Sequence, residues 1–171
     1  MKTQIIFNIV LLVALVFGPY PVHTVAAPSA APQTQSSAWW DSSWQFRKEI
    51  SVDHSKVGAD LAGFPLLVSL DSDADLASDA QADGDDIAFA DAGGTRLDHE
   101  IEYFDGATGE LVAWVNVPLV SSTADTVLYM YYGNPGASNQ ENATGVWDAD
   151  YALVQHLEEV SGTHYDSTSN S

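Results

Sequence analysis

The chain contains no cysteine among its 171 residues, so disulfides take no part in its stability. Packing or bound ions must therefore hold the fold together. Basic residues are also scarce, because five Lys and Arg are set against 24 Asp and Glu, which gives a net charge of −19. A field of this sign repels phosphate backbones and anionic lipid, so the composition disfavours nucleic acid and membrane surfaces as partners.

Long apolar runs are absent beyond the N-terminal region, so the mature chain is not expected to span a membrane. The N-terminal region itself has the order of a secretory signal peptide: Lys2, an apolar stretch from Ile5 to Phe17, and small residues around Ala26. The apolar stretch is shorter than the ~20 residues that a membrane-spanning helix needs. The sequence therefore predicts a cleaved signal peptide at residues 1–26 and a protein that is secreted, at the cell surface or periplasmic.

Long amphipathic helices are missing as well, and the dominant hydrophobic period from Trp39 onward is two. Residues 27–38 are small, polar and proline-containing, which is typical of a flexible linker. Strands are expected at residues 45–52, 64–70, 97–103, 111–117 and 126–132, with a shorter one at 87–89, a helical turn within 74–82, and Pro118 as a strand end. This pattern predicts an all-β fold, an antiparallel β-sandwich of jelly-roll type, at residues 39–148. Trp114 lies in the middle of an apolar strand and is expected in its core.

Five short strings occur together in this order: Trp39–Trp44 with Arg47 and Ile50, Asp83–Ile87, His99–Glu102, Ala113–Val115, and Tyr131–Pro135. The set resembles the prokaryotic family known as domain of unknown function 2341, over roughly residues 39–148. The resemblance implies a module that follows a signal peptide in long secreted or envelope proteins. Such modules often precede a lectin-like sandwich or a proton-channel transport subunit. The resemblance implies no reaction and no catalytic residues.

A new apolar segment begins near residue 149. Its string Val154–Glu159, followed by Asp166–Thr168, resembles the first strand of a concanavalin-like or laminin-G-like lectin domain. We therefore expect residues 149–171 to be the truncated start of a second, lectin-like β domain.

Carboxylates are crowded between Asp71 and Asp86, and calcium is the ion that such oxygen ligands suit best. The run from Asp71 begins like a helix-loop-helix calcium loop, but Leu76 replaces the required glycine and Ala82 the bidentate glutamate. An irregular calcium site remains as a hypothesis, with Asp83, Asp85 and Asp86 as candidate ligands. The alternative is a solvated acidic loop.

His99, Glu100 and Glu102 resemble part of a zinc protease motif, but a strand places His99 on the face opposite to both glutamates. We therefore expect His99 to pack inward beneath an acidic, solvent-facing surface. Trp39, Trp40 and Trp44 cluster at the start of the module and are the candidate ligand-binding residues, because exposed indole rings stack on sugar faces. The alternative for these rings is core packing, and one of them is expected to anchor the first strand.

These observations favour a binding or adhesion module of an exported protein, with neutral polysaccharide as the expected ligand. A structural spacer that presents a downstream lectin-like or transport domain is the alternative. Part of a glycan-degrading enzyme is a third hypothesis, although the sequence has no nucleophile turn, phosphate loop or dinucleotide fingerprint.

Overall fold

The structure, a computed structural model, describes residues 39–157 and 160–170. The predicted signal peptide (1–26) and linker (27–38) lie outside the described residues. Within them, no helix has the length and apolar character needed to cross a bilayer.

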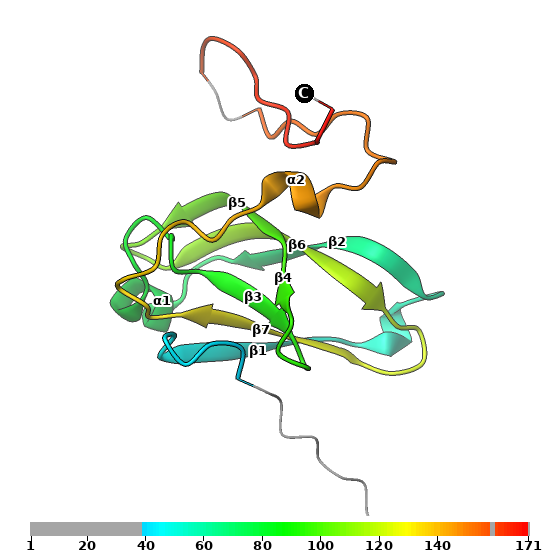
Figure 1. Ribbon diagram of the computed structural model, residues 1–171, viewed down its shortest axis with the longest axis horizontal. Helices are drawn as coiled ribbons and strands as arrows, with labels where there is room; N and C mark the ends of the chain where they lie inside the picture. Colours follow the sequence, from blue (N-terminus) through cyan, green and yellow to red (C-terminus); the bar gives the residue numbers. More distant parts are fainter. Residues whose placement is uncertain (1–38, 158–159, 171) are drawn as a thin grey trace, which may run out of the picture. The chain divides into compact units, whose positions relative to one another are not determined.

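Two antiparallel sheets face each other and form a sandwich (Figure 1). The four-stranded sheet has the order β1–β7–β3–β4, and the three-stranded sheet has the order β2–β6–β5. The strands are β1 (Phe46–Val52), β2 (Leu61–Leu70), β3 (Ala88–Asp91), β4 (Arg96–Leu97), β5 (His99–Asp105), β6 (Glu110–Val120) and β7 (Thr126–Tyr132). Two short helices lie between strands, η1 (His54–Lys56) and α1 (Ala74–Asp79), and a third, α2 (Ala143–Val146), follows β7. The predicted all-β sandwich is confirmed.

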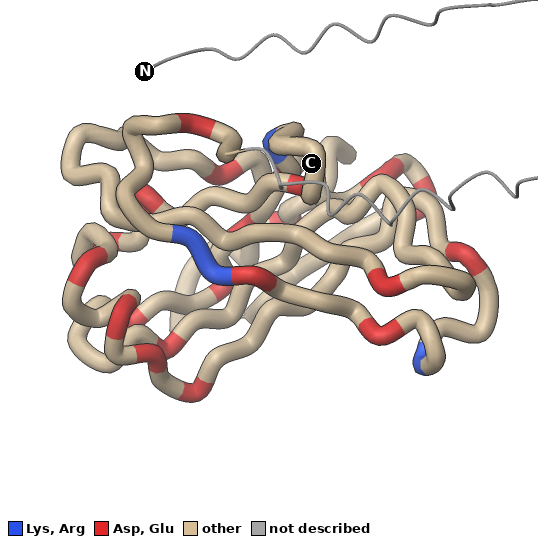
Figure 2. The backbone as a smooth tube through the Cα atoms, turned by 90° about the horizontal axis from the view of Figure 1, so that it is seen from below, with Lys and Arg blue, Asp and Glu red and all other residues tan. Residues whose placement is uncertain are grey.

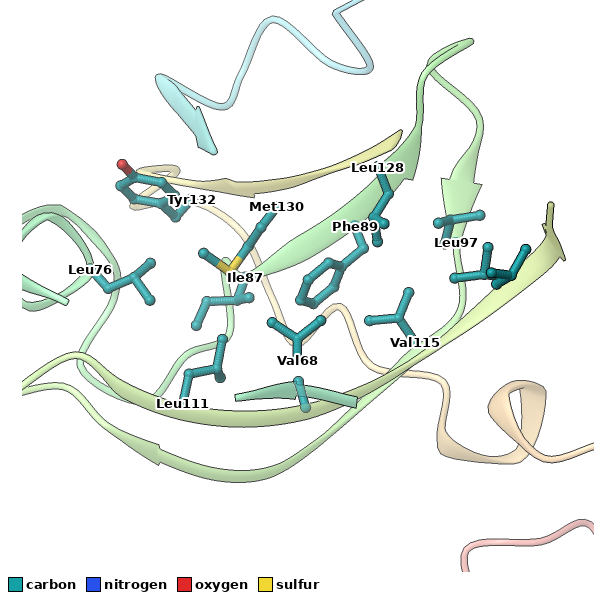
Figure 3. Close-up of a cluster of buried hydrophobic side chains, with 13 residues drawn as sticks. Val68, Leu76, Ile87, Phe89, Leu97, Leu111, Val115, Leu128, Met130 and Tyr132 are labelled. Atoms are coloured by element: carbon teal, nitrogen blue, oxygen red, sulfur yellow. The ribbon is translucent and has the colours of Figure 1, made fainter. Parts of the chain in front are cut away.

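The core lies between the sheets and follows the two-residue period of the strands (Figure 3). From β6 it takes Leu111, Ala113, Val115 and Val117, and from β7 it takes Leu128, Met130 and Tyr132. Trp114 was expected in this core, but the prediction is wrong because Ala113 and Val115 are the neighbours that point inward. Trp114 is half-buried on the outer face of its sheet.

The strand expected at residues 97–103 is divided between the two sheets. Leu97 ends β4 in the four-stranded sheet, and His99 begins β5 in the three-stranded one. The chain thus changes layer at Asp98 and closes one side of the sandwich.

Two other expectations are corrected. Pro118 does not end its strand, because β6 continues to Val120. The residue on β2 that would face Pro118 is Gly63, which adopts a left-handed φ of 56° and belongs to no registered pair. Residues 149–157, where a new strand was expected to begin, form no strand.

Candidate functional site

Aromatic side chains collect on the outer face of the four-stranded sheet. Because Leu128, Met130 and Tyr132 point into the core, Tyr129 and Tyr131, which alternate with them, point outward. The segment before β1 folds back over these rings and places Trp39, Trp40 and Trp44 beside them. We call the five aromatic residues Trp39, Trp40, Trp44, Tyr129 and Tyr131 the aromatic platform.

Trp44 is the anchor of the platform. Its side chain is 6% exposed, and its indole N–H donates to the carbonyl oxygen of Asp86 at 2.6 Å. The turn before it is closed by Asp41, whose carboxylate accepts from the Ser43 N–H at 2.8 Å. The ring of Trp40 packs against that of Trp44 at an interplanar angle of 51°, with 4.6 Å between their centroids. The expectation that one of the three tryptophans anchors the first strand is therefore confirmed.

Trp39 is the exposed member of the platform. It is 44% exposed and meets Tyr131 edge to face, with ring centroids 5.4 Å apart. The guanidinium carbon of Arg47 on β1 lies 4.8 Å from the Trp39 ring centre and 4.2 Å from that of Tyr129. Cation–π contacts of this kind stabilise an aromatic ring at the surface by about 0.5–1 kcal/mol. Arg47 therefore holds the exposed indole in a defined position.

An open hollow of about 730 Å³ adjoins these rings. Its lining combines apolar faces from Trp39, Trp40 and Trp44 with polar groups from Ser42 and Gln45. All three predicted ligand-binding residues thus contribute to one surface. Trp44 contributes least as a contact, because its ring is almost fully buried.

The three predicted calcium ligands differ in their exposure. Asp83 is exposed and Asp85 is half-buried, whereas Asp86 is fully buried. Both carboxylate oxygens of Asp86 accept backbone N–H groups, from Gln81 (2.8 Å) and from Gly133 and Asn134 (2.8 and 2.9 Å). These hydrogen bonds give the Asp86 carboxylate a role in the fold itself. Asp86 therefore joins the loop after α1 to the residues that follow β7, and a calcium site at these aspartates stays a prediction.

The carboxylates at the start of the acidic run are used structurally as well. Asp73 caps α1 by accepting from the backbone N–H groups of Asp75 and Leu76, both at 3.0 Å. Lys48 on β1 donates to Asp73 at 2.6 Å and to Asp75 at 2.8 Å. Burial opposes the charge of Lys48, but the hydrogen bonds to the two aspartates outweigh it and raise the pKa of the lysine. The same contact ties α1 to β1.

One cluster in the described residues has the ligand spacing of a metal site, and it was not predicted. Asp53, His54 and Asp125 each offer a ligand atom within 4.8 Å of the others. His54 Nδ1 lies 2.6 Å from the Asp125 carboxylate, and this hydrogen bond lowers the pKa of Asp125. Sequence reasoning missed the cluster because Asp125 lies far from His54 along the chain and joins it only when β1 pairs with β7. The two carboxylates are exposed; that of Asp125 is hydrogen-bonded to His54, whereas that of Asp53 accepts from the Ser55 backbone N–H.

His99 packs inward, as expected, and is fully buried. The acidic face opposite to it is not open to solvent, however. Glu100 is 8% exposed because residues from the C-terminal segment cover it. Its carboxylate accepts the Trp147 indole N–H at 2.8 Å and the Ser167 hydroxyl. His156 lies with one ring nitrogen 3.2 Å from Glu100 and the other 3.2 Å from Glu102.

Comparison with known proteins gives one match. The family model described as Domain of unknown function (DUF2341) matches residues 83–170. No curated protein and no solved structure matches the chain. The match continues past residue 148, where the sequence predicts a boundary, and it includes the residues that cover Glu100. A lectin-like domain after that boundary stays a prediction.

Proposed function

The chain belongs to the family of unknown function DUF2341, and from that premise we propose that it is a binding module of an exported protein that recognises neutral polysaccharide. Family membership supplies no activity, so the proposal depends on the site. The observation that carries it is the aromatic platform, in which Trp39 is 44% exposed beside a hollow lined by two further indole rings.

The rings of the platform are held before any ligand arrives. Trp44 is fixed by its hydrogen bond to Asp86, Trp40 packs against Trp44, and Arg47 lies over Trp39. A preformed apolar surface loses little conformational entropy on binding, so this cost subtracts little from the stacking free energy with a sugar face. Shallow sites of this type give dissociation constants of about 10⁻³ to 10⁻⁵ M, or about −4 to −7 kcal/mol.

Net charge narrows the ligand class. The chain carries a net charge of −19, so uronic-acid or sulfated polymers are repelled over the whole molecule. Neutral glycans suffer no such repulsion and stack through dispersion and apolar contact alone. The exported location that the N-terminal sequence predicts would place the module where such polymers occur.

A glycan array followed by calorimetry, both on the full exported chain, tests this function. We expect binding of neutral glycans that is lost in the Trp39→Ala variant, with or without added calcium. Tyr165→Ala is the matched control, because it removes another exposed ring, 76% exposed, that belongs to no part of the platform. An array without signal for the unaltered chain, with and without calcium, would favour the structural spacer instead. Glycan binding that survives Trp39→Ala combined with Trp40→Ala would place the site elsewhere.

A further inference from the structure

The sandwich is closed on one side and open on the other. The passage from β4 to β5 closes one side, whereas β1 and β2 are edge strands of their respective sheets. Between these two edges lies a cavity of about 450 Å³, lined by residues 50–53, Lys56 and residues 66–70. We call this feature the β1–β2 groove.

The floor of the groove consists of core side chains that lack a full cover. Ile50, Val52, Leu66 and Leu70 pack against the main hydrophobic cluster but are only partly buried. By comparison, the core-facing side chains of the central strands are fully covered: Val115 on β6 is 0% exposed and Leu128 on β7 is 1% exposed. The apolar core thus reaches the surface between β1 and β2.

The edge strand β2 is unusually open to pairing. Natural edge strands avoid association by carrying charges, prolines or bulges. Leu61–Leu70 contains no charged residue, and its exposed side chains include Leu61, Phe64 and Leu67 at 39%, 36% and 47% exposure. Gly63 and Pro65 interrupt its first half, but Leu66–Leu70 has neither glycine nor proline. This second half is the part that lines the groove.

The charged residues around the groove indicate what charge its binding partner should carry. Asp60 and Asp71 lie immediately before and after β2, and Asp53 lies in the groove wall, whereas Lys56 is the one basic residue in that wall. Pairing with a second copy of this chain in antiparallel register would place Asp60 of one β2 near Asp71 of the other. Two chains of net charge −19 would also repel each other. The geometry therefore points to a different partner.

We propose that the β1–β2 groove binds an extended apolar peptide segment with basic residues at both ends, which adds as a strand to β2. Main-chain hydrogen bonds to Leu66–Leu70 supply the pairing, and alternate apolar side chains of the peptide cover the exposed core. Lysine or arginine at the ends of the peptide meets Asp71, which follows Leu70, and Asp53 in the groove wall. This activity is separate from glycan recognition, because no platform residue lines the groove.

The test uses the full chain and a fluorescent peptide in which alternating valine and threonine are flanked by lysines. Two control peptides have the same core flanked by glutamates, or a central proline that prevents strand pairing. By fluorescence anisotropy, we expect the lysine peptide to bind at least about tenfold more tightly than either control. Hydrogen exchange should show protection of Leu66–Leu70 when this peptide is bound. Equal binding of all three peptides, or binding without this protection, would overturn the proposal.

Matched variants locate the site. Leu67→Lys places a charge on the groove strand and should weaken binding of the lysine peptide at least about tenfold. Leu119→Lys is the control, because Leu119 is similarly exposed (51%) on the same sheet but does not line the groove. If Leu67→Lys fails to fold by circular dichroism, Ser69→Lys replaces it. Equal affinity of the groove and control variants, or a chain that dimerises through β2 in sedimentation, would overturn the proposal. Trp39→Ala should leave peptide binding unchanged, which separates this test from that of glycan recognition.

Discussion

His99 is a titratable side chain that the fold has removed from water. It is fully buried between the sheets, its ring meets Phe89 edge to face, and neither ring nitrogen has a partner at hydrogen-bonding geometry. Burial, followed by repulsion from Arg96, lowers the pKa of His99 to about 4, although backbone groups of Leu97 and Ile87 oppose the shift slightly. The folded protein therefore keeps this imidazole neutral at ordinary pH.

A pH dependence of stability follows. Below pH 6.5 the unfolded chain takes up a proton on His99 that the folded chain does not, so stability falls as the pH decreases from 6.5 towards 4. The loss amounts to about 3 kcal/mol at the lower end of this window. Urea unfolding at a series of pH values measures it. In the His99→Leu variant the decline over the same window should be smaller by about this amount. The same pH dependence in both proteins would contradict the assignment.

Asp86 illustrates how surroundings decide the role of a residue. The sequence shows it as one of several clustered aspartates, which indicates a cation site or a solvated loop. In the fold both of its oxygens accept backbone N–H groups, and two of these donors, Gly133 and Asn134, directly follow β7, 47 and 48 residues away along the chain. No local pattern reports such long-range donors, so sequence reasoning recognised the residue but not its function.

At the scale of elements, the segment after α2 is held on the three-stranded sheet by Glu100. Trp147, His156 and Ser167 all contact this one carboxylate. The ring of Trp147 also lies 5.3 Å from that of Trp114 on β6. Residues 149–157 and 160–170 contain no strand, so side-chain contacts of this kind replace a hydrogen-bonded ladder.

The Glu100→Ala variant should release this segment. Removing the carboxylate leaves the Trp147 indole N–H without its acceptor and takes away two further contacts. We expect the amides of Val154, Ser167 and Thr168, which are hydrogen-bonded in the intact protein, to exchange at least about tenfold faster. Hydrogen exchange read by mass spectrometry measures this, with Glu110→Ala as the control on the neighbouring strand. Unchanged protection would show that other contacts hold the segment.

Elements were predictable where a two-residue period ran without interruption. The strand expected from this period at 45–52 is β1. The strand at 126–132, expected from a run that is apolar on both faces, is β7, and the helical turn expected within 74–82 contains α1. Predictions failed where both faces of a strand are apolar, and where the chain passes from one sheet to the other. Trp114 belongs to an apolar strand that is covered on both faces, so composition alone could not tell which face is the core. The step from β4 to β5 at Asp98 keeps the alternation of apolar residues, and the pattern therefore gives no sign of it.

At the scale of the whole molecule, the three features occupy different parts of one sandwich. The aromatic platform lies on the outer face of the four-stranded sheet, and the segment held by Glu100 lies on the outer face of the three-stranded one. The β1–β2 groove opens between the two sheets. A glycan on the platform and a strand in the groove would therefore not compete for the same residues.

Charge acts on all of these parts together. Asp and Glu are spread along the described chain, whereas Lys and Arg occur at few positions (Figure 2). Lys48 pairs with both Asp73 and Asp75, but the chain has five basic residues for 24 acidic ones, so its carboxylates remain largely uncompensated. Their mutual repulsion favours the expanded, unfolded chain over the compact one.

Salt should therefore stabilise the protein. Raising NaCl from about 0.01 M to about 1 M shortens the screening length from about 30 Å to about 3 Å, which removes most repulsion between separate surface carboxylates. We expect the melting temperature to rise by about 3–6 °C, equivalent to about 1–2 kcal/mol for a chain of this size. Choline chloride should give the same rise if screening is the cause, because choline offers no site-specific coordination.

The alternative cause of a salt effect is binding of a cation at a specific site. Calcium chloride at matched ionic strength tests for such binding. A further rise with calcium that disappears in Asp125→Asn would assign it to the cluster of Asp53, His54 and Asp125. A melting temperature that stays constant or falls as NaCl increases would show that the acidic surface does not limit the stability of this fold.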